Sequence, residues 1–353
     1  MTVPVIDPFG VTSDPELPSL ALALDPAQVW KRLNRRVPGL TGEGGRADLR
    51  RIRVIRYKPG RRCVIEYDTE VTRPGRPLEA VTLIGKVRRN RYGVSGYELL
   101  KAFWQAGFDA DAPDGISVPE PIGTIARFRM WLQRKVPGQV ATELLPARGG
   151  PALARRIVDA ADKVHRSGVP TDRSHTMIEE LDILDTCLPH VAQMESRLAG
   201  RIDRLLDACH RLGDATPETP RLGIHRDFYA DQVIVHGERL YLIDFDEYCV
   251  GDPALDIGNF VGAVTEQSVR TLGDPEALVD VERAAEQRFV EIRGERYRPV
   301  VRAYALLTLA RQVYVSARIP ERRAWIGRLL ELCEERFGIV DQSRVGLSQP
   351  VRL

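Results

Sequence analysis

The chain of 353 residues has a formal net charge of +2 and an apolar fraction of 43%. This length suits one large domain or two ordinary ones, and this apolar content supports a folded core, which excludes global disorder. A charge so close to balance gives no support for a nucleic-acid-binding or membrane-surface protein.

The first predicted helix begins at Pro26, after an irregular leader at residues 1–25. Asp25 precedes Pro26, and an acidic N-cap followed by proline at the first helical position is a typical helix start. The leader contains acids and prolines but no basic region, so it does not have the pattern of a secretory signal.

Strand-like runs follow the first helix. They are Arg51–Tyr57, Cys63–Val71, Ala80–Arg88, Pro121–Ile125 and Arg129–Arg134. Turns rich in proline and glycine separate the first three runs, which predicts an antiparallel meander. A segment with helical spacing, Gly96–Ala106, lies between the third and fourth runs. Together these elements predict a β-rich lobe with a five-stranded antiparallel sheet.

Beyond Gly138 the pattern changes from strands to helices. Apolar residues recur at three and four positions along Ala154–His165, as on one face of an amphipathic helix. One or two further helices are predicted in 174–212, and a long helical region in 281–337. Between them, 222–248 is predicted to form a strand, a loop and a second strand.

This change of pattern divides the chain and gives an α+β fold class. We expect a small antiparallel N-lobe, a larger mainly helical C-lobe, and a ligand in the cleft between two such lobes. The predicted segments are the leader at 1–25, the N-lobe at 26–135, the C-lobe at 136–340 and a tail at 341–353.

Cysteine usage and hydropathy indicate a cytoplasmic protein. The five cysteines are scattered, odd in number and without a C-x-x-C pair, which argues against a disulfide framework or a structural zinc site. No apolar run approaches the roughly 20 residues that a membrane span needs. We therefore expect a soluble protein of the cytoplasm with no membrane partner.

One stretch of the C-lobe, from His225 to Asp256, carries residues suited to phosphoryl transfer. That reaction needs a carboxylate that orients a hydroxyl and accepts its proton, and a metal ion that neutralises the phosphates. Asp227 lies in an H-x-D sequence on a loop after a strand, and Asp244 ends an apolar strand in a D-F-D sequence. A hairpin that returned Asp244 beside Asp227 would place two carboxylates together, and oxygen ligands suit magnesium.

The same stretch resembles the phosphotransferase family that includes aminoglycoside phosphotransferases and choline kinases. That family shares its fold with protein kinases and reads H-x-D-x-x-x-x-N, then a strand, I-D-F/W and G-D-P-x-x-D. The matching residues are His225, Asp227, Asp244, Gly251, Asp252, Pro253 and Asp256. The resemblance extends, more weakly, over residues 50–335. It implies a protein-kinase-like fold, ATP or GTP and Mg²⁺ as cofactors, and a small hydroxylated molecule as acceptor, with no nucleic-acid partner.

The resemblance implies roles for three residues of the N-lobe beside the nucleotide. Lys86, on the third strand, matches the lysine that contacts the α- and β-phosphates. Glu98 matches the helix glutamate that pairs with this lysine. Ile84 lies two residues before Lys86 on the same strand face, so it would line the adenine side of the cleft.

Two further segments match nucleotide-binding positions of the family. Lys58–Arg62 takes the place of the loop that covers the phosphates, although it holds one glycine rather than a glycine-rich sequence. Gln133, Arg134 and Lys135 match the hinge whose backbone meets adenine.

The run from Arg46 to Arg62 carries eight basic residues and one acid. Alternation with apolar residues favours a strand with one solvated face. Contact of Arg61 or Arg62 with nucleotide phosphates is the second interpretation, and nucleic-acid binding the third.

The metal site departs from the family pattern at two positions. Gln232 stands where the family has asparagine; it keeps a carbonyl oxygen but is one methylene longer, so it is either a metal ligand or a loop residue that left the site inactive. Asp246 adds a third carboxylate that would bind metal or, with Glu247, face the acceptor.

The remaining motif residues are interpreted as structural. The resemblance implies that Asp256 holds the catalytic loop through hydrogen bonds to its backbone, and His225 and Asp252 are assigned the same supporting role. His165, at the end of a predicted helix, is also expected to be structural.

The motifs leave the acceptor and the class of activity open. An aminoglycoside, a sugar or an amino alcohol all fit as acceptor. The helical region before the motif carries acids that would either recognise an amine or form a solvated helix face. These acids are Glu179, Glu180, Asp182 and Asp185. The alternatives are a nucleotide-binding pseudokinase, which Gln232 favours, and a protein kinase, against which the short Asp244–Gly251 connection argues. The sequence does not define the oligomeric state.

Overall fold

The computed structural model describes residues 2–89 and 94–339, and the chain forms two compact units. Unit 1 comprises Met1–Gly138 and Ile234–Asp246, and unit 2 comprises Gln139–Val233 and Glu247–Leu353. The segment His225–Asp256, which the sequence predicts to lie in one C-lobe, is therefore divided between the two units. Asp227 belongs to unit 2, whereas Asp244 and Asp246 belong to unit 1.

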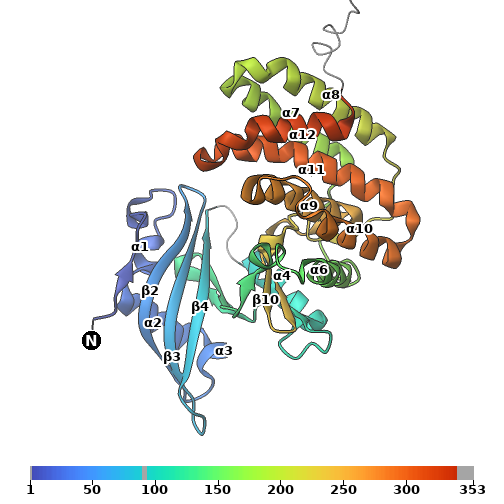
Figure 1. Cartoon of the computed structure of the whole chain (residues 1–353). Helices are drawn as coiled ribbons and strands as arrows, with labels where there is room; N and C mark the ends of the chain where they lie inside the picture. The colour runs from blue at the N-terminus through green and yellow to red at the C-terminus, as the bar shows by residue number, and fades with distance from the viewer. Residues whose placement is uncertain (1, 90–93, 340–353) are drawn as a thin grey trace, which may run out of the picture. The chain divides into compact units, whose positions relative to one another are not determined.

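Unit 1 is built on a β-sheet whose described strands run in the order β1-β2-β3-β4-β7-β6 (Figure 1). The strands are β1 (Val5–Ile6), β2 (Arg46–Lys58), β3 (Arg62–Thr72), β4 (Glu79–Arg88), β6 (Pro121–Ile125) and β7 (Met130–Arg134). From β2 to β6 every neighbouring pair is antiparallel, as predicted. The strand β1 adds a parallel partner at the edge beside β2.

Residues 1–25 differ from the predicted irregular leader. They contain β1, a 3₁₀ turn at Val11–Ser13 and the short helix α1 (Leu20–Ala23). Several of their apolar side chains, including Val11 and Leu17, are buried in the core of unit 1, whereas Val5, Ile6 and Phe9 are exposed. Prolines interrupt this stretch every few residues, so no element is long enough to show a periodic pattern.

Helix α2 (Pro26–Arg36) packs into the same core and begins where the sequence predicts. Asp25 Oδ1 accepts hydrogen bonds from the N–H groups of Ala27 and Gln28, at 2.8 and 3.2 Å. These bonds satisfy two of the amide groups that a helix start leaves without partners. Val29 and Leu33 point into the core.

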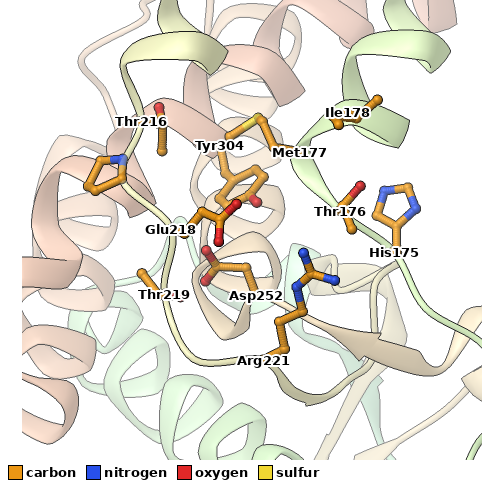
Figure 2. A pocket seen from close by; sticks show the side chains of 11 residues that line it. His175, Thr176, Met177, Ile178, Thr216, Glu218, Thr219, Arg221, Asp252 and Tyr304 are labelled. Atoms are coloured by element: carbon orange, nitrogen blue, oxygen red, sulfur yellow. The ribbon is translucent and has the colours of Figure 1, made fainter.

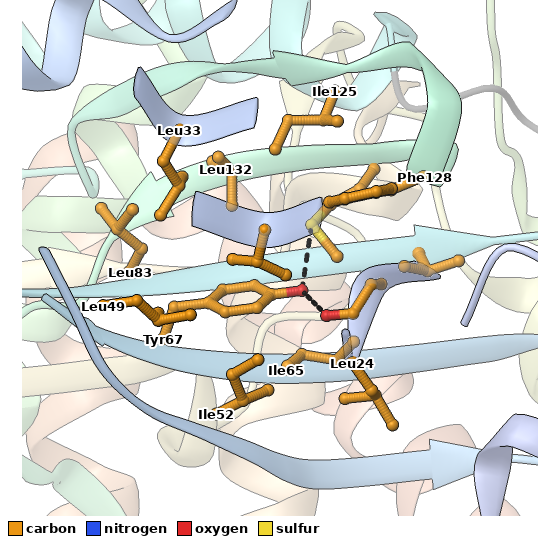
Figure 3. Packing of buried hydrophobic residues seen from close by; sticks show 14 of the residues in the cluster. Leu24, Leu33, Leu49, Ile52, Ile65, Tyr67, Leu83, Ile125, Phe128 and Leu132 are labelled. Atoms are coloured by element: carbon orange, nitrogen blue, oxygen red, sulfur yellow. Dashed lines mark hydrogen bonds between the residues drawn. The ribbon is translucent and has the colours of Figure 1, made fainter. Parts of the chain in front are cut away.

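Tyr67 of β3 is the largest side chain in the centre of this core (Figure 3). Its hydroxyl donates to the carbonyl oxygen of Ala23 at 3.0 Å, and the sulfur of Met130 lies 3.6 Å away. The bond ties the end of α1, inside the expected leader, to the middle of the sheet.

The next elements of unit 1 surround residues Asp244–Asp246, which we call the D-F-D turn. Helix α4 (Val94–Phe103) continues into a π-helical turn at Trp104–Phe108, and β5 (Ile116–Ser117) pairs in parallel with β11 (Arg239–Leu242). Strand β10 (Val233–His236) lies beside β11. The ring of Phe245 packs on Phe103 of α4 with centroids 4.3 Å apart.

Unit 2 is mainly helical. Its longer helices are α6 (Gly150–His165), α7 (Met177–Met194), α8 (Ala199–Ala215), α9 (Pro253–Gln267), α10 (Val279–Arg293), α11 (Arg298–Arg318) and α12 (Ile326–Phe337). Short elements are β8 (Gln139–Val140), α5 (Ala141–Leu144), and the antiparallel pair β9 (Leu222–Ile224) and β12 (Cys249–Gly251). The predicted helices in 154–165, 174–212 and 281–337 are all present.

Helix α9 was not predicted, and it lies at the centre of unit 2, packed along α11 (Figure 1). It is buried on nearly every side, so its sequence has no amphipathic stripe. Two of its glycines allow the close approach. A Cβ on Gly258 would lie 2.3 Å from Tyr304 Cβ, and one on Gly262 would lie 2.6 Å from the Ala305 carbonyl oxygen.

We expect Tyr67→Phe to lower the free energy of unfolding of unit 1 by about 1 to 2 kcal/mol, because the buried Ala23 carbonyl loses its donor. Denaturant titration followed by fluorescence measures the change. The control is Tyr241→Phe. The Tyr241 side chain is half-buried, and its hydroxyl has no hydrogen-bond partner among the described residues. Equal stability of the two variants would contradict the assigned bond.

Candidate active site

In unit 1, Asp244 and Asp246 face three basic side chains from β3 and β4. Lys86 Nζ is 3.5 Å from Asp244 Oδ1, and the Arg62 guanidinium is 4.0 Å from each carboxylate. Arg88 is 3.9 Å from Asp244 and forms an ion pair with Asp246. Lys86 and Arg88 are two residues apart on β4, and Arg62 pairs with Arg88 in register, so strand geometry places all three on one face.

The turn that carries Asp244 is held in a conformation uncommon for a residue with a side chain. Asp244 has φ +65°, in the left-handed region. Such a conformation costs on the order of 1 kcal/mol and persists where the surroundings fix it. The buried Phe245 ring, packed on Phe103, provides this support.

Lys86 is enclosed at this site. Burial is the largest influence on the pKa of the Lys86 ammonium and lowers it, while the charge of Asp244 opposes this effect. The ammonium also lies 5.0 Å from the centroid of the Trp131 ring, within range of a cation–π interaction. The site therefore places the Lys86 side chain on the strand face that, by the resemblance, would meet the nucleotide phosphates.

The other nucleotide-binding candidates have varied surroundings. Glu98 is exposed on α4, and among the described residues no ion pair joins it to Lys86. Ile84 is 9% exposed and pairs in register with Gln133 of β7. Arg61 is exposed on the β2–β3 turn. The nucleotide roles of these residues stay predictions.

The side chains of the expected hinge are engaged in ion pairs. Arg134 contacts Glu120 at 2.7 Å and Glu79 at 2.9 Å. Lys135 contacts Glu66 at 2.6 Å. Gln133, the remaining residue of the segment, is buried and carries no charge to pair, and contact of the hinge backbone with adenine stays a prediction.

In unit 2, the loop that carries Asp227 is bound to a buried carboxylate of α9. Asp256 accepts hydrogen bonds from the backbone N–H groups of His225 at 2.9 Å and Arg226 at 2.7 Å. His165 Nε2, at the end of α6, lies 2.9 Å from the same carboxylate. Asp256, His165 and His225 are all buried, so these bonds form away from water.

A second side chain of α9 fixes the same loop from the other side of the peptide. Arg226 has φ +68°, and Asn259 Nδ2 donates to its carbonyl oxygen at 2.6 Å. Asn259 Oδ1 in turn accepts from Thr308 Oγ1 and from Arg311 of α11, both at 2.8 Å. The residue before Asp227 is thus held at its N–H and its carbonyl.

Arg311 connects this network to the acids before the catalytic segment. Its guanidinium donates to the Tyr229 hydroxyl and to Glu180, at 3.2 Å for Glu180. Although burial raises the pKa of Glu180, the charges of Arg311 and His175 lower it overall. Burial raises the pKa of Tyr229 to about 12, so its hydroxyl stays protonated. The sequence motifs do not include Arg311 or Asn259, because Arg311 lies on a helix distant in sequence and Asn259 lies just beyond the last motif residue, Asp256.

Asp227 lines a cavity of about 500 Å³ within unit 2. The wall includes Tyr229 and Gln312. Other residues of the wall come from α9, from the helical turn that follows α9, and from α11. This volume falls in the range of small-molecule sites. Asp227 is half-buried, so its carboxylate lies at the wall of this cavity rather than in the core.

The remaining predicted residues of unit 2 have identifiable contacts. Gln232 is 8% exposed in the 3₁₀ turn Ala230–Gln232, and its N–H donates to the carbonyl of Tyr229. Glu247 forms ion pairs with Arg173 at 2.7 Å and Arg226 at 2.9 Å. The acceptor role of Glu247 therefore competes with a role in holding the catalytic loop.

Asp252 caps α9 and lines a second, smaller pocket of about 120 Å³ (Figure 2). Its carboxylate accepts from Ala254 N–H at 2.9 Å, and burial raises its pKa. Figure 2 shows Glu218, Arg221 and Asp252 gathered around the opening. Because Asp227 does not line this pocket, the larger cavity is the better candidate for a reacting group.

The donor chemistry of the D-F-D turn fits a magnesium ion. Carboxylate oxygens are the ligands that Mg²⁺ prefers, and Asp244 and Asp246 provide them on one turn. Within the described residues no group of three or more His, Cys, Asp or Glu side chains forms a complete protein cage. Sites that bind Mg²⁺ together with nucleotide phosphates use only one or two carboxylates, so this composition is compatible.

A sequence profile of the phosphotransferase enzyme family matches residues 97–325, more than half of the 353-residue chain. The chain belongs to this family. The resemblance drawn from the His225–Asp256 segment is confirmed. No curated protein matches the sequence significantly.

Solved structures with the same fold come from this family and related kinases. A choline/ethanolamine kinase family protein from Mesorhizobium loti is 17% identical over 90% of this chain and 96% of its own, with a TM-score of 0.50. An aminoglycoside phosphotransferase solved with ADP and hygromycin B is 15% identical over 86% of this chain and 96% of its own, with a TM-score of 0.53. A Plasmodium vivax ethanolamine kinase is 10% identical over 88% and 90%, with a TM-score of 0.54.

At these identities the likeness shows the fold, which is the predicted protein-kinase-like α+β class. Membership in the family makes the protein a phosphotransferase. Over the described ranges, no helix combines the length and apolarity that a bilayer crossing would need.

We expect Asp256→Ala to lower the free energy of unfolding of unit 2 by about 3 kcal/mol or more, because two backbone N–H groups and His165 lose a buried, charged partner. Thermal and denaturant unfolding measure the loss. The control, Asp182→Ala, removes an exposed carboxylate from α7 and should change stability by less than about 0.5 kcal/mol. A similar loss in both variants would contradict the bracing role.

Proposed function

We propose that this phosphotransferase is a kinase that moves the γ-phosphoryl group of ATP, or GTP, to a hydroxyl of a small molecule. The observation that carries the proposal is the contact of Lys86 with the D-F-D carboxylate Asp244. A lysine on the third strand of the meander and an aspartate after the later hairpin are the residues that such kinases use at the phosphates and their metal.

The proposed roles follow from charge and hydrogen-bonding capacity. Asp227 orients the acceptor hydroxyl and accepts its proton as the oxygen attacks phosphorus. Lys86 holds the non-transferred phosphates. Asp244 and Gln232 would hold Mg²⁺, which when bound neutralises charge on the phosphates.

Arg62 and Arg88 extend the positive surface around Lys86. Without nucleotide they neutralise Asp244 and Asp246. A triphosphate carries several negative charges, so it offers these guanidiniums stronger partners than the two carboxylates. We therefore propose that Arg62 contacts the phosphates, while Arg61 stays an exposed residue of the β2–β3 turn.

The rival function is a nucleotide-binding pseudokinase, and Gln232 is the feature that favours it. The bracing of the Asp227 loop by Asp256 and Asn259 favours an enzyme instead. A loop held this tightly suits a group that must meet a reacting atom within a fraction of an ångström. The compartment is proposed to be the cytoplasm, and the acceptor to be a small molecule rather than a protein.

We expect ATP or GTP with Mg²⁺ to raise the melting temperature of the purified protein, since a ligand of the native state stabilises it by about 2.7 kcal/mol at a hundred times its Kd. Asp244→Ala should remove the magnesium-dependent part of the shift. Asp227→Asn should keep the shift but slow γ-phosphoryl loss by about a hundredfold or more. The control is Asp280→Ala, whose side chain is 80% exposed.

An Asp244→Ala protein with an unchanged magnesium-dependent shift would remove Asp244 from the metal site. An Asp227→Asn protein with unchanged turnover would remove the proposed base. Absence of any shift with either nucleotide would refute the kinase assignment in this form.

Gln232→Asn separates the enzyme from its pseudokinase rival. If Gln232 already binds magnesium through its amide oxygen, the shorter asparagine should change nucleotide turnover by no more than about tenfold, because the ligand atom is kept. Turnover is measured by formation of the nucleoside diphosphate at saturating nucleotide, because both transfer to an acceptor and hydrolysis release that product. A wild-type protein without turnover that gains it with asparagine would instead establish the pseudokinase.

A further inference from the structure

Arginines make up part of the wall of the cavity beside Asp227. Three of them line it, Arg270, Arg311 and Arg322, together with three acids, Asp227, Asp231 and Glu266. Arg270 lies in the π-helical extension of α9, Ser268–Leu272, Arg311 lies on α11, and Arg322 lies in the 3₁₀ turn Pro320–Trp325.

Arg270 and Arg322 share one carboxylate. Arg270 Nε lies 2.7 Å from Glu266 Oε1, its second nitrogen lies 3.2 Å from Glu266 Oε2, and Arg322 lies 3.7 Å from the same side chain. For these two guanidiniums the described residues show no other acidic partner. This part of the wall therefore carries two positive charges against one negative charge.

The three side chains differ in exposure, so a ligand in the cavity would meet the positive charges more readily than the negative one. The Glu266 side chain is 5% exposed, whereas those of Arg270 and Arg322 are 23% and 32% exposed. Glu266 is thus the most buried member of this group, and the two guanidiniums are the members more accessible to a ligand in the cavity. A pair of held guanidiniums is suited to bind an oxyanion in a fixed orientation.

Arg311 has a different task, because its donors are already used. It contacts Glu180, Tyr229 and Asn259 at the base of the Asp227 loop. We treat it as a positioning residue of that loop and do not include it among the ligand-binding groups.

Three of the four acids that the sequence offers for an amine-bearing acceptor have partners, and the fourth, Asp182, is exposed on α7. Glu180 is buried between His175 and Arg311, and Glu179 caps α7 through Thr176. Asp185 pairs with His210 at 2.8 Å. None of these three acids lines the cavity beside Asp227.

From this pattern we infer that the acceptor is a hydroxylated molecule carrying an oxyanion, a carboxylate or a phosphate ester, which Arg270 and Arg322 bind while Asp227 engages the hydroxyl. The inference rests on the proposed function, because it takes the cavity beside Asp227 as the acceptor site. It names the chemistry of the acceptor, which the sequence motifs leave open. Gln312, on the same wall, adds a neutral hydrogen-bonding group for the remaining hydroxyls.

The test uses acceptors built on one sugar that differ only in charge: glucose, gluconate, glucose 6-phosphate and glucosamine. Binding to the full-length protein is measured by titration calorimetry with Mg²⁺ and a non-hydrolysable ATP analogue present. We expect gluconate, glucose 6-phosphate or both to bind at least about tenfold more tightly than glucose, and glucosamine to bind no better than glucose. Preference between the two anions identifies the source of the oxyanion.

The variants assign this preference to the arginines. Arg270→Gln combined with Arg322→Gln should abolish the preference for anions, whereas Glu266→Gln should increase it, because both guanidiniums then lack a neutralising partner. A merely structural role of Arg270 would not give opposite effects in these two proteins. The control is Arg283→Gln, an arginine 73% exposed on α10 that does not line the cavity.

Binding that is equal for glucose and its anionic derivatives, or strongest for glucosamine, would overturn the inference, as would a preference for anions that survives the double substitution. These outcomes are separate from failure of the proposed function. The nucleotide-dependent shift in melting temperature is measured in the same preparations. A protein that binds nucleotide and shows no preference for anions refutes only the acceptor inference, whereas one that binds no nucleotide refutes the kinase.

Discussion

The structure of the helical unit depends on one buried carboxylate. Asp256 accepts the N–H groups of two consecutive residues, His225 and Arg226, and the ring of His165 completes its surroundings. A buried anion without these donors would cost several kcal/mol, and a loop with Arg226 in the left-handed region would relax without the anion. The buried carboxylate of Asp256 and the loop conformation at Arg226 therefore stabilise each other. Together they fix the position of Asp227, although neither is assigned a part in the reaction.

The sheet side of the fold could be predicted well because its signals are local. Strand alternation and proline–glycine turns placed β2, β3, β4, β6 and β7, and the Asp25–Pro26 pair placed the start of α2. Two regions of the chain were not predicted correctly from the sequence. Helix α9 is buried all round and lacks a stripe, and the first 25 residues contain elements too short to show a period. In both cases burial by distant parts of the chain, rather than local pattern, determines the structure.

The candidate site divides in the same way. Motif spacing identified the residues whose types the chemistry demands, such as Asp227 and Asp244. It did not identify Arg88, Asn259 or Arg311, because an arginine or an asparagine on a strand or helix is common and gains its meaning only from the carboxylate or carbonyl that it meets. Glu98 shows the opposite case: a position implied by resemblance is exposed here and lacks an ion pair with Lys86 among the described residues. Contacts between residues far apart in sequence carry the information that the motifs omit.

The division of the chain into units has a consequence for its synthesis. Because Ile234–Asp246 belongs to unit 1, the chain passes from one unit to the other after Gly138, after Val233 and after Asp246. The first 138 residues leave the ribosome without the hairpin that carries Phe245, the packing partner of Phe103. At roughly 5 to 20 residues per second, many seconds pass before that hairpin emerges. During this interval the nascent sheet unit exposes an apolar surface, and no cut at a single peptide bond separates the two units into complete halves.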